Sequence, residues 1–326
     1  MTATTNRPLR VLTWHVHGNY LHYLSWAPHT FYLPTKAGRP EGFGGRRGTL
    51  PWRDNLVEIK AEDVRHTEFD LVLYQSRRNW ETDRFEILSD EQRALPSVYL
   101  EHDPPRGTPT DTQHPCDDPR TLVVHCTHFN ELMWDNHGVP TRVIDHGVVV
   151  PDDAAYTGEL ERGIAVVNDI ATRGRRLGKD VFERVRAEVP IDLAGMGSLT
   201  VGGIGEVEHG DLPYVETKYR FFFNPIRYTS LGLSVLEAMT LGMPVLGLAT
   251  TEMVSAVRNG VNGYVETDVG KLIGHMKRLL SDPAEARALG EAGREIATER
   301  FGIERFARDW DDVLTEAAAR KAVVSA

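Results

Sequence analysis

Residues 229–237, TSLGLSVLE, combine a glycine, a predicted helix start and a carboxylate, and this set can hold an anion or a sugar. Gly232 lets the backbone approach a ligand closely. The predicted helix turns free amides and the positive end of its dipole toward a phosphate or sugar oxygen. We expect these amides to be those of Ser230, Leu231, Gly232 and Leu233. Glu237 follows in the same helix, where its carboxylate can accept hydrogen bonds from two adjacent hydroxyl groups.

A purely structural interpretation of this carboxylate is also open. Ser234 and Glu237 have the Ser-x-x-Glu spacing of a capping box, in which the acid accepts a hydrogen bond from a free backbone amide. In that case Glu237 stabilises the helix and binds no ligand. The local residues by themselves favour the cap.

A cluster of cations follows the apolar run GIAVVND. The stretch IATRGRRLGKDVF carries four basic residues within residues 173–179: Arg173, Arg175, Arg176 and Lys179. Fixed cations at the end of a strand can bind an anion such as a phosphate group. The alternative is a solvated loop, where basic residues are common. No convincing Asp-x-Asp pair occurs between strands, so the sequence predicts charge neutralisation by side chains and no metal site.

The elements that position these residues read as two series of short apolar strands separated by helical stretches, which is typical of parallel α/β sheets. The first series comprises RVLTWHV, TFYLP, FDLVLY, SVYLEH, TLVVHC and RVIDHG, and the second comprises GIAVVND, PIDLAGM, YRFFFNP, MPVLGLA and NGYVE. The segment VVPDDAAYTGELERG between them is typical of a hinge. We predict two Rossmann-like domains, residues 1–152 and 153–326, facing an inter-domain cleft, with a last helix to about residue 318 that crosses back to the first domain.

From about Arg162 to Trp310 the order and spacing of elements resemble the nucleotide-binding half of the GT-B glycosyltransferases, in particular family 4, whose members are retaining and use nucleotide-sugar donors. That family has two glutamates eight positions apart around a glycine loop, then Ala-Met, a glycine and a Pro-led strand. The stretch TSLGLSVLEAM…LGMPVLG matches this motif except that Thr229 replaces the first glutamate. Thr229 is neutral and shorter, so the contact to the donor sugar is altered, supplied elsewhere or lost.

The resemblance implies roles for the matched residues. Glu237 would bind the ribose hydroxyls of the donor. Arg173 and Lys179 would clamp the diphosphate, with Arg175 or Arg176 as substitutes for Arg173. The nucleotide sugar is then a substrate, and no further cofactor is expected.

The first domain resembles the family only in outline. Gly18 and Asn19 follow the first strand, where GT-B enzymes place a loop against the donor phosphates. His102 ends the strand SVYLEH, near the position of a histidine that lies close to the transferred sugar in the family, although a hydrogen-bonded structural histidine is the alternative. The remaining strand-end histidines show no metal-ligand spacing and are assigned to packing or acceptor contacts: His125, His128 and His146.

A long glycine-rich stretch, KAGRPEGFGGRRGTLPWRDN, carries several basic residues. Such a loop is functional or disordered. It is suited to an anionic acceptor or a membrane surface, although a solvated flexible loop is the default interpretation.

The overall composition of the chain limits the classes of partner that it can bind. With 47 acidic and 37 basic residues, the chain lacks the positive excess of a nucleic-acid binder. Two cysteines form neither a zinc set nor a disulfide framework. No apolar segment of about 18 residues is present. We therefore expect a cytoplasmic protein, with peripheral contact to the inner face of a membrane as a further option.

These features and the resemblance together predict a metal-independent glycosyltransferase that moves a sugar from a nucleoside-diphosphate donor to a glycan, lipid or small-molecule acceptor. Retention of configuration is implied by the resemblance alone. Two rivals keep the fold. One is a non-catalytic nucleotide-sugar-binding or interaction protein, which Thr229 suggests. The other is a sugar epimerase, which the missing glutamate disfavours because proton transfer at the sugar needs carboxylates.

Overall fold

The computed structural model describes residues 7–320 of the chain. The chain divides into two compact units. The first unit holds the residues up to Gly147 together with those from Ile303 onward, and the second unit runs from Val148 to Gly302. The division falls before the predicted boundary at residues 152/153, and the last helix is counted with the first unit.

The first unit contains a seven-stranded sheet in the order β3-β2-β1-β4-β5-β6-β7. All of its paired strands are parallel. The strands are β1 (Arg10–Thr13), β2 (Thr30–Thr35), β3 (Leu56–Lys60), β4 (Leu71–Tyr74), β5 (Ser97–Glu101), β6 (Thr121–His125) and β7 (Thr141–Val143). The helices are α1 (Gly18–Leu24), η1 (Ala61–His66), η2 (Asn79–Asp83), α2 (Arg84–Ile87), α3 (Asp90–Arg93), α4 (His128–Met133) and α12 (Ile303–Ala319).

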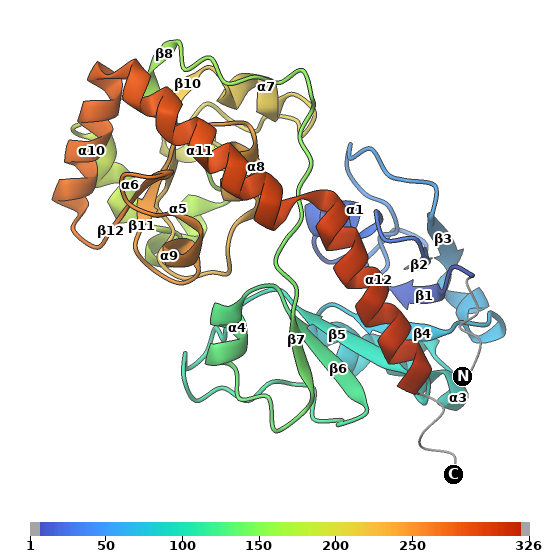
Figure 1. Cartoon of the computed structure of the whole chain (residues 1–326). Helices are drawn as coiled ribbons and strands as arrows, with labels where there is room; N and C mark the ends of the chain where they lie inside the picture. Colours follow the sequence, from blue (N-terminus) through green and yellow to red (C-terminus); the bar gives the residue numbers. More distant parts are fainter. Residues whose placement is uncertain (1–6, 321–326) are drawn as a thin grey trace. The chain divides into compact units, whose positions relative to one another are not determined.

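The last helix, α12, packs against α1 and against β4 and β5 (Figure 1). Trp310 is fully buried and donates a hydrogen bond from Nε1 to the hydroxyl oxygen of Tyr20 at 3.2 Å. A Cβ atom added to Gly147 would lie 2.2 Å from Cβ of Phe306, so a glycine is needed where α12 meets the end of the β7 segment. The apolar face of this amphipathic helix therefore completes the core of the first unit.

The second unit contains a five-stranded sheet in the order β12-β11-β10-β8-β9, again with parallel pairs throughout. The strands are β8 (Leu160–Val166), β9 (Ile191–Ala194), β10 (Tyr219–Asn224), β11 (Val245–Leu248) and β12 (Gly263–Glu266). The helices are α5 (Ile170–Arg173), η3 (Gly174–Leu177), α6 (Lys179–Arg186), η4 (Ser198–Val201), α7 (Leu212–Glu216), α8 (Leu233–Thr240), α9 (Met253–Ala256), α10 (Val269–Ser281) and α11 (Pro283–Phe301).

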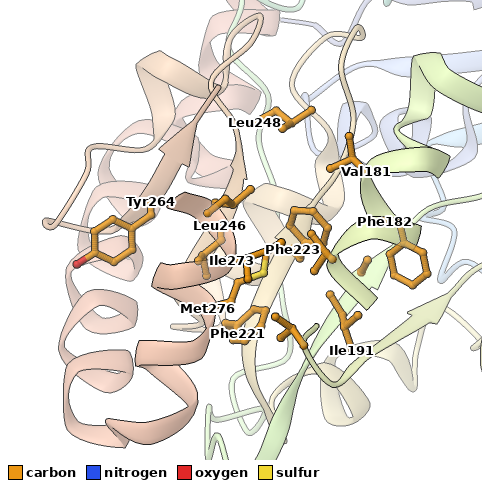
Figure 2. Packing of buried hydrophobic residues seen from close by; sticks show 14 of the residues in the cluster. Val181, Phe182, Ile191, Phe221, Phe223, Leu246, Leu248, Tyr264, Ile273 and Met276 are labelled. Atoms are coloured by element: carbon orange, nitrogen blue, oxygen red, sulfur yellow. The ribbon is translucent and has the colours of Figure 1, made fainter. Parts of the chain in front are cut away.

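The core of the second unit is built on β10, whose six residues are all buried. Phe221 and Phe223 project to the same side of the sheet because alternate residues of a strand share a face. Figure 2 shows them near Leu246 of β11 and Ile273 of α10. A Cβ atom on Gly163 of β8 would lie 2.2 Å from the Phe221 ring, so a small residue in β8 admits this aromatic layer.

Every strand predicted from an apolar run is confirmed, and one strand was missed. The missed strand is β3, whose sequence LVEIK follows the glycine-rich stretch and alternates charged and apolar residues over a short length. Asp282 is the N-cap of α11, because its side chain accepts from the amides of Ala284 and Glu285. The side chain of Glu285 accepts from the Tyr264 hydroxyl at 2.8 Å.

Each sheet has a point at which its strand order reverses, between β1 and β4 in the first unit and between β8 and β10 in the second. Open parallel α/β sheets bind ligands beyond the carboxyl ends of the strands at such a point. In the second unit the end of β8 leads into the four basic residues within 173–179, here called the cation cluster or cation loop. The end of β10 leads into residues 225–232, here called the glycine loop. The topology therefore brings together the two stretches that the sequence singled out.

Candidate functional site

Two loops of the second unit are joined by backbone hydrogen bonds. The carbonyl of Arg176 accepts from the amides of Arg227 at 3.0 Å and Tyr228 at 3.4 Å. The Arg227 guanidinium also donates to the carbonyl of Arg175 at 2.8 Å. The loop after β10 is therefore fixed to the loop after β8.

Gly178 lies directly against the loop after β10. Its φ of +77° belongs to the left-handed region, and an added Cβ atom would lie 1.9 Å from the carbonyl oxygen of Pro225. Only glycine meets both conditions without a backbone shift. Gly178 caps α6, so the same residue sets the start of the helix that carries Lys179.

The cations of the cluster differ in how they are neutralised. Asp180 accepts two hydrogen bonds from Arg227, at 2.5 and 2.8 Å, and one from Arg175 at 2.6 Å. The hydrogen bond from Arg227 holds the pKa of Asp180 below its usual value, so this carboxylate stays ionised. Arg175 is thus a member of a structural ion-pair network.

Arg173 and Lys179 keep more freedom. Lys179 is paired with Glu183 one turn along α6, at 2.5 Å, and both side chains are partly exposed. Arg173 is exposed, and within residues 7–320 no hydrogen bond or ion pair holds its side chain. Arg176 is half-buried, and it is the carbonyl of this residue that joins the two loops.

The glycine loop leads into α8, and Gly232 is the N-cap of that helix. Gly232 has an extended backbone, and an added Cβ would meet only Ser234 Oγ at 3.7 Å and Val235 Cγ2 at 3.9 Å. Nothing in the second unit demands a glycine there, in contrast to Gly178. The close approach of a ligand to Gly232 stays a prediction, and it supplies a reason for a glycine that packing does not.

The residues beside Gly232 are held close to the protein. Ser230 and Leu231 are buried, and the Ser230 hydroxyl has no hydrogen-bond partner among the described residues. Thr229 is half-buried on the same loop, and Leu233 is the first residue of α8. A buried hydroxyl without a partner carries a desolvation cost, which a bound oxygen would relieve.

The capping-box interpretation of Glu237 is wrong. The helix begins at Leu233 with Gly232 as its N-cap, and no side chain caps it. Ser234 therefore lies inside the first turn, and Glu237 is the fifth residue of α8 rather than the third. Glu237 is only 7% exposed, so it is a buried carboxylate that needs an explanation other than capping.

Gly18 and Asn19 belong to the first unit and open α1. A Cβ atom on Gly18 would lie 3.1 Å from Leu50 Cδ1 and 3.2 Å from His15 Nε2, so its neighbours already restrict this position. Asn19 is half-buried in the first turn of α1. The roles predicted for both residues against donor phosphates remain predictions.

His102 follows β5 in the first unit and contacts Gln75. The Gln75 amide nitrogen donates to Thr13 Oγ1 and to the Trp14 carbonyl, both at 2.8 Å, so its Oε1 is left to face His102 Nε2 at 3.2 Å. Amide oxygens only accept, so Nε2 of His102 carries the proton. Burial, with smaller contributions from His17 and His146, lowers the pKa of His102 well below its ordinary value. His102 is therefore a neutral imidazole near pH 7.

The other histidines do not form a metal site. His125 bonds Asn136 at 3.0 Å, and burial lowers its pKa to about 4. Residues 7–320 contain no group of three or more His, Cys, Asp or Glu side chains arranged to hold a metal ion. Over the same range, no helix combines the length and apolar character that crossing a membrane requires.

Comparison with known structures establishes the class of fold. The chain is similar to a sucrose-phosphate synthase from Thermosynechococcus elongatus, with a TM-score of 0.72, 16% identity, and coverage of 96% of this chain and 100% of the other. It is also similar to the Anabaena protein HepE in complex with UDP-glucose, with a TM-score of 0.66, 13% identity, and coverage of 94% and 100%. The predicted GT-B fold, with two parallel-sheet α/β units, is confirmed.

Sequence comparison narrows the class for the second unit. Residues 199–296 match the family model "Glycosyl transferases group 1". An O-antigen chain mannosyltransferase B from Escherichia coli is 30% identical over 113 residues, or 35% of this chain. A sucrose synthase 2 from Hordeum vulgare is 26% identical over 139 residues, or 39% of this chain. These matches span only 28% and 17% of the two relatives.

Proposed function

We propose that this protein is a GT-B glycosyltransferase resembling family 4, which transfers a sugar from a nucleoside-diphosphate donor to an acceptor with retention of configuration and without a metal ion. The observation that carries the proposal is the joining of the cation loop and the glycine loop at the switch point of the second sheet. The glycine loop and α8 lie inside the segment that matches the group 1 model.

The assigned residues bind different parts of the donor. Glu237 receives the ribose hydroxyls, because a carboxylate accepts from two hydroxyl groups at once. Arg173 and Lys179, together with the amides at the start of α8, hold the diphosphate and stabilise its charge as the glycosidic bond breaks. The two carboxylates near these cations differ in how firmly they are held. Glu183 is a partly exposed neighbour that Lys179 can leave, whereas Asp180 is held by Arg227.

The sugar and the acceptor are assigned less directly. His102 is proposed to face the transferred sugar, and Gly18 and Asn19 to face the donor phosphates. The acceptor is a glycan, a lipid or a small molecule. The proposed setting is the cytoplasm, with peripheral contact to a membrane where the acceptor is a lipid.

The experiment is release of nucleoside diphosphate from a panel of UDP, GDP, ADP, TDP and CDP sugars, with magnesium or with a chelator. We expect release from one donor, unchanged by the chelator and lost in Glu237→Ala. Lys277→Ala is the matched control, because Lys277 is paired with Glu188 at 2.8 Å on an exposed surface. Release that needs the metal would overturn metal independence. Equal release by Glu237→Ala would overturn the donor site.

A second function is favoured by one residue. Thr229 stands where the resemblance places the first glutamate, so a non-catalytic nucleotide-sugar-binding protein is the alternative proposal. Binding of a nucleotide sugar without any release or transfer would support it. Restoring the acid with Thr229→Glu would then be expected to raise release above that of the parent chain.

A further inference from the structure

Glu216 is a buried carboxylic acid that the proposed donor chemistry does not use. It is the last residue of α7 and only 1% exposed, and its Oε1 has no hydrogen-bond partner among the described residues. Ionised carboxylates are almost never fully buried without a partner, because the loss of hydration costs several kcal/mol. The position therefore favours the protonated form of Glu216.

The helix that carries Glu216 packs on the helix that carries Glu237. Contacts join α7 to α8, and both helices also contact β10. Glu237 is buried on α8 as Glu216 is on α7. Two carboxyl groups that share a poorly hydrated region cannot both ionise cheaply, so one of them keeps a proton.

Among the charged groups on the elements packed against Glu216, Glu237 is the group that interacts with it. On α8, Glu237 is the sole charged residue, and on β10 the sole charged residue is Arg220. The Arg220 guanidinium donates to the carbonyls of Gly158, Leu279 and Leu280. The segment that pairs with Thr217 carries Asp153, which accepts from the Tyr214 hydroxyl at 2.7 Å. Arg220 is thus the one cation within α8 and β10, and its hydrogen bonds go to these carbonyls rather than to Glu216.

We propose that Glu216 stays protonated at neutral pH and positions Glu237, so that the pair offers a single carboxylate to the ribose of the donor. A protonated carboxyl group has an O–H to donate, and a neighbouring carboxylate is a strong acceptor. Glu216 is then a positioning residue, not a catalytic one. This inference rests on the proposed donor site.

The electrostatic direction agrees with this geometry. Burial, and then the charge of Glu237, raise the pKa of Glu216 well above its ordinary value. A carboxyl group whose pKa is raised on folding stabilises the folded protein at low pH. That stabilisation is lost as the pH rises from about 4.5 through the folded-state pKa.

The test combines nucleotide affinity with infrared spectroscopy at pH 7. Glu216→Gln copies the shape of the protonated acid. Its affinity for whichever of UDP, GDP, ADP, TDP and CDP the parent binds should therefore stay within about twofold of the parent. Glu216→Ala should weaken affinity about tenfold, which is the equivalent of one well-made hydrogen bond. Glu159→Gln is the matched control, because Glu159 is exposed in the same unit.

The infrared band of a protonated carboxyl group reports the proton directly. We expect this band at pH 7 in the parent and in Glu159→Gln, and its loss in Glu216→Gln. In Glu237→Gln the band should disappear at a lower pH, because the repelling charge has been removed. No Glu216-dependent band, or equal losses of affinity in Glu216→Gln and Glu216→Ala, would overturn the inference. Undiminished nucleotide binding by Glu237→Ala would instead overturn the proposed function and leave the infrared result standing.

Discussion

The carboxyl edges of the two sheets carry different chemistry. In the second unit the edge holds exposed or partly exposed cations and a glycine loop, tied together through Arg227 and Gly178. In the first unit the matching edge carries aromatic side chains around the neutral imidazole of His102, whose ring centroid lies 4.4 Å from that of His17 and 4.8 Å from that of Tyr20. Charge suits the binding of a diphosphate, whereas neutral hydrogen-bonding rings suit an uncharged sugar or acceptor.

The largest expected effect falls on the cations of the second unit. Lys179→Ala should lower turnover by about 10²–10³, because groups that stabilise charge in the transition state contribute that much. Stability should change little, since the Lys179–Glu183 pair is partly exposed. Steady-state kinetics beside Lys277→Ala checks this. A loss of turnover below threefold would contradict the assignment.

The second effect concerns the contact that joins the two loops. Gly178→Ala should lower the free energy of unfolding by about 3 kcal/mol, from left-handed strain together with the clash against Pro225. Gly260→Ala is the control, because Gly260 has a similar φ of +74° in the same unit but nothing lies within 4 Å of an added Cβ. It should cost only about 1 kcal/mol. Denaturant unfolding measures the free energy of unfolding of both variants. Equal losses would show that the close approach of Gly178 to Pro225 adds no cost.

A third prediction sharpens the contrast with the first unit. The lowered pKa of His102 means that the folded protein resists a proton that the unfolded chain accepts. Stability from His102 is present above about pH 6.5 and is lost as the pH falls through the folded-state pKa, at about 1.4 kcal/mol for each pH unit between the two pKa values. NMR titration of the imidazole checks it. A cationic His102 at pH 6.5 would contradict the neutral imidazole expected at this edge of the first sheet.

The smallest effect belongs to the ion pair at the surface of the loops. Arg227→Ala should lower the free energy of unfolding by about 0.5–1 kcal/mol, because Arg227 and Asp180 are both partly exposed. Arg175→Ala should have almost no effect, since its side chain is 76% exposed. Thermal unfolding of both variants tests the ranking, and the reverse order would show that Arg175 holds the loops.

Sequence patterns predicted what depends on neighbours in the chain. Apolar runs identified all strands except β3, and the glycine motif identified the loop before α8. The capping-box alternative put Ser234 at the N-cap of α8, whereas the structure has Gly232 there. A stronger signal was the family motif, which places the glycine before the helix.

Contacts between distant segments could not be read from the sequence. The role of Gly178 depends on Pro225, and Arg227 was overlooked because its partner Asp180 lies on another element. Glu216 gave no signal either, since its helix is short and its burial arises only from packing on α8 and β10. Such residues are set by the topology that brings separate elements together.

The most direct measurement is thermal unfolding against UDP, GDP, ADP, TDP and CDP, for the parent chain and for Glu237→Ala. A ligand at about 100 times its dissociation constant adds about 2.7 kcal/mol to the folded state, which raises the midpoint by several degrees. We expect a shift with one nucleotide, unchanged by magnesium and absent in Glu237→Ala. No shift with any nucleotide, or the same shift in both proteins, would contradict a donor site built around Glu237.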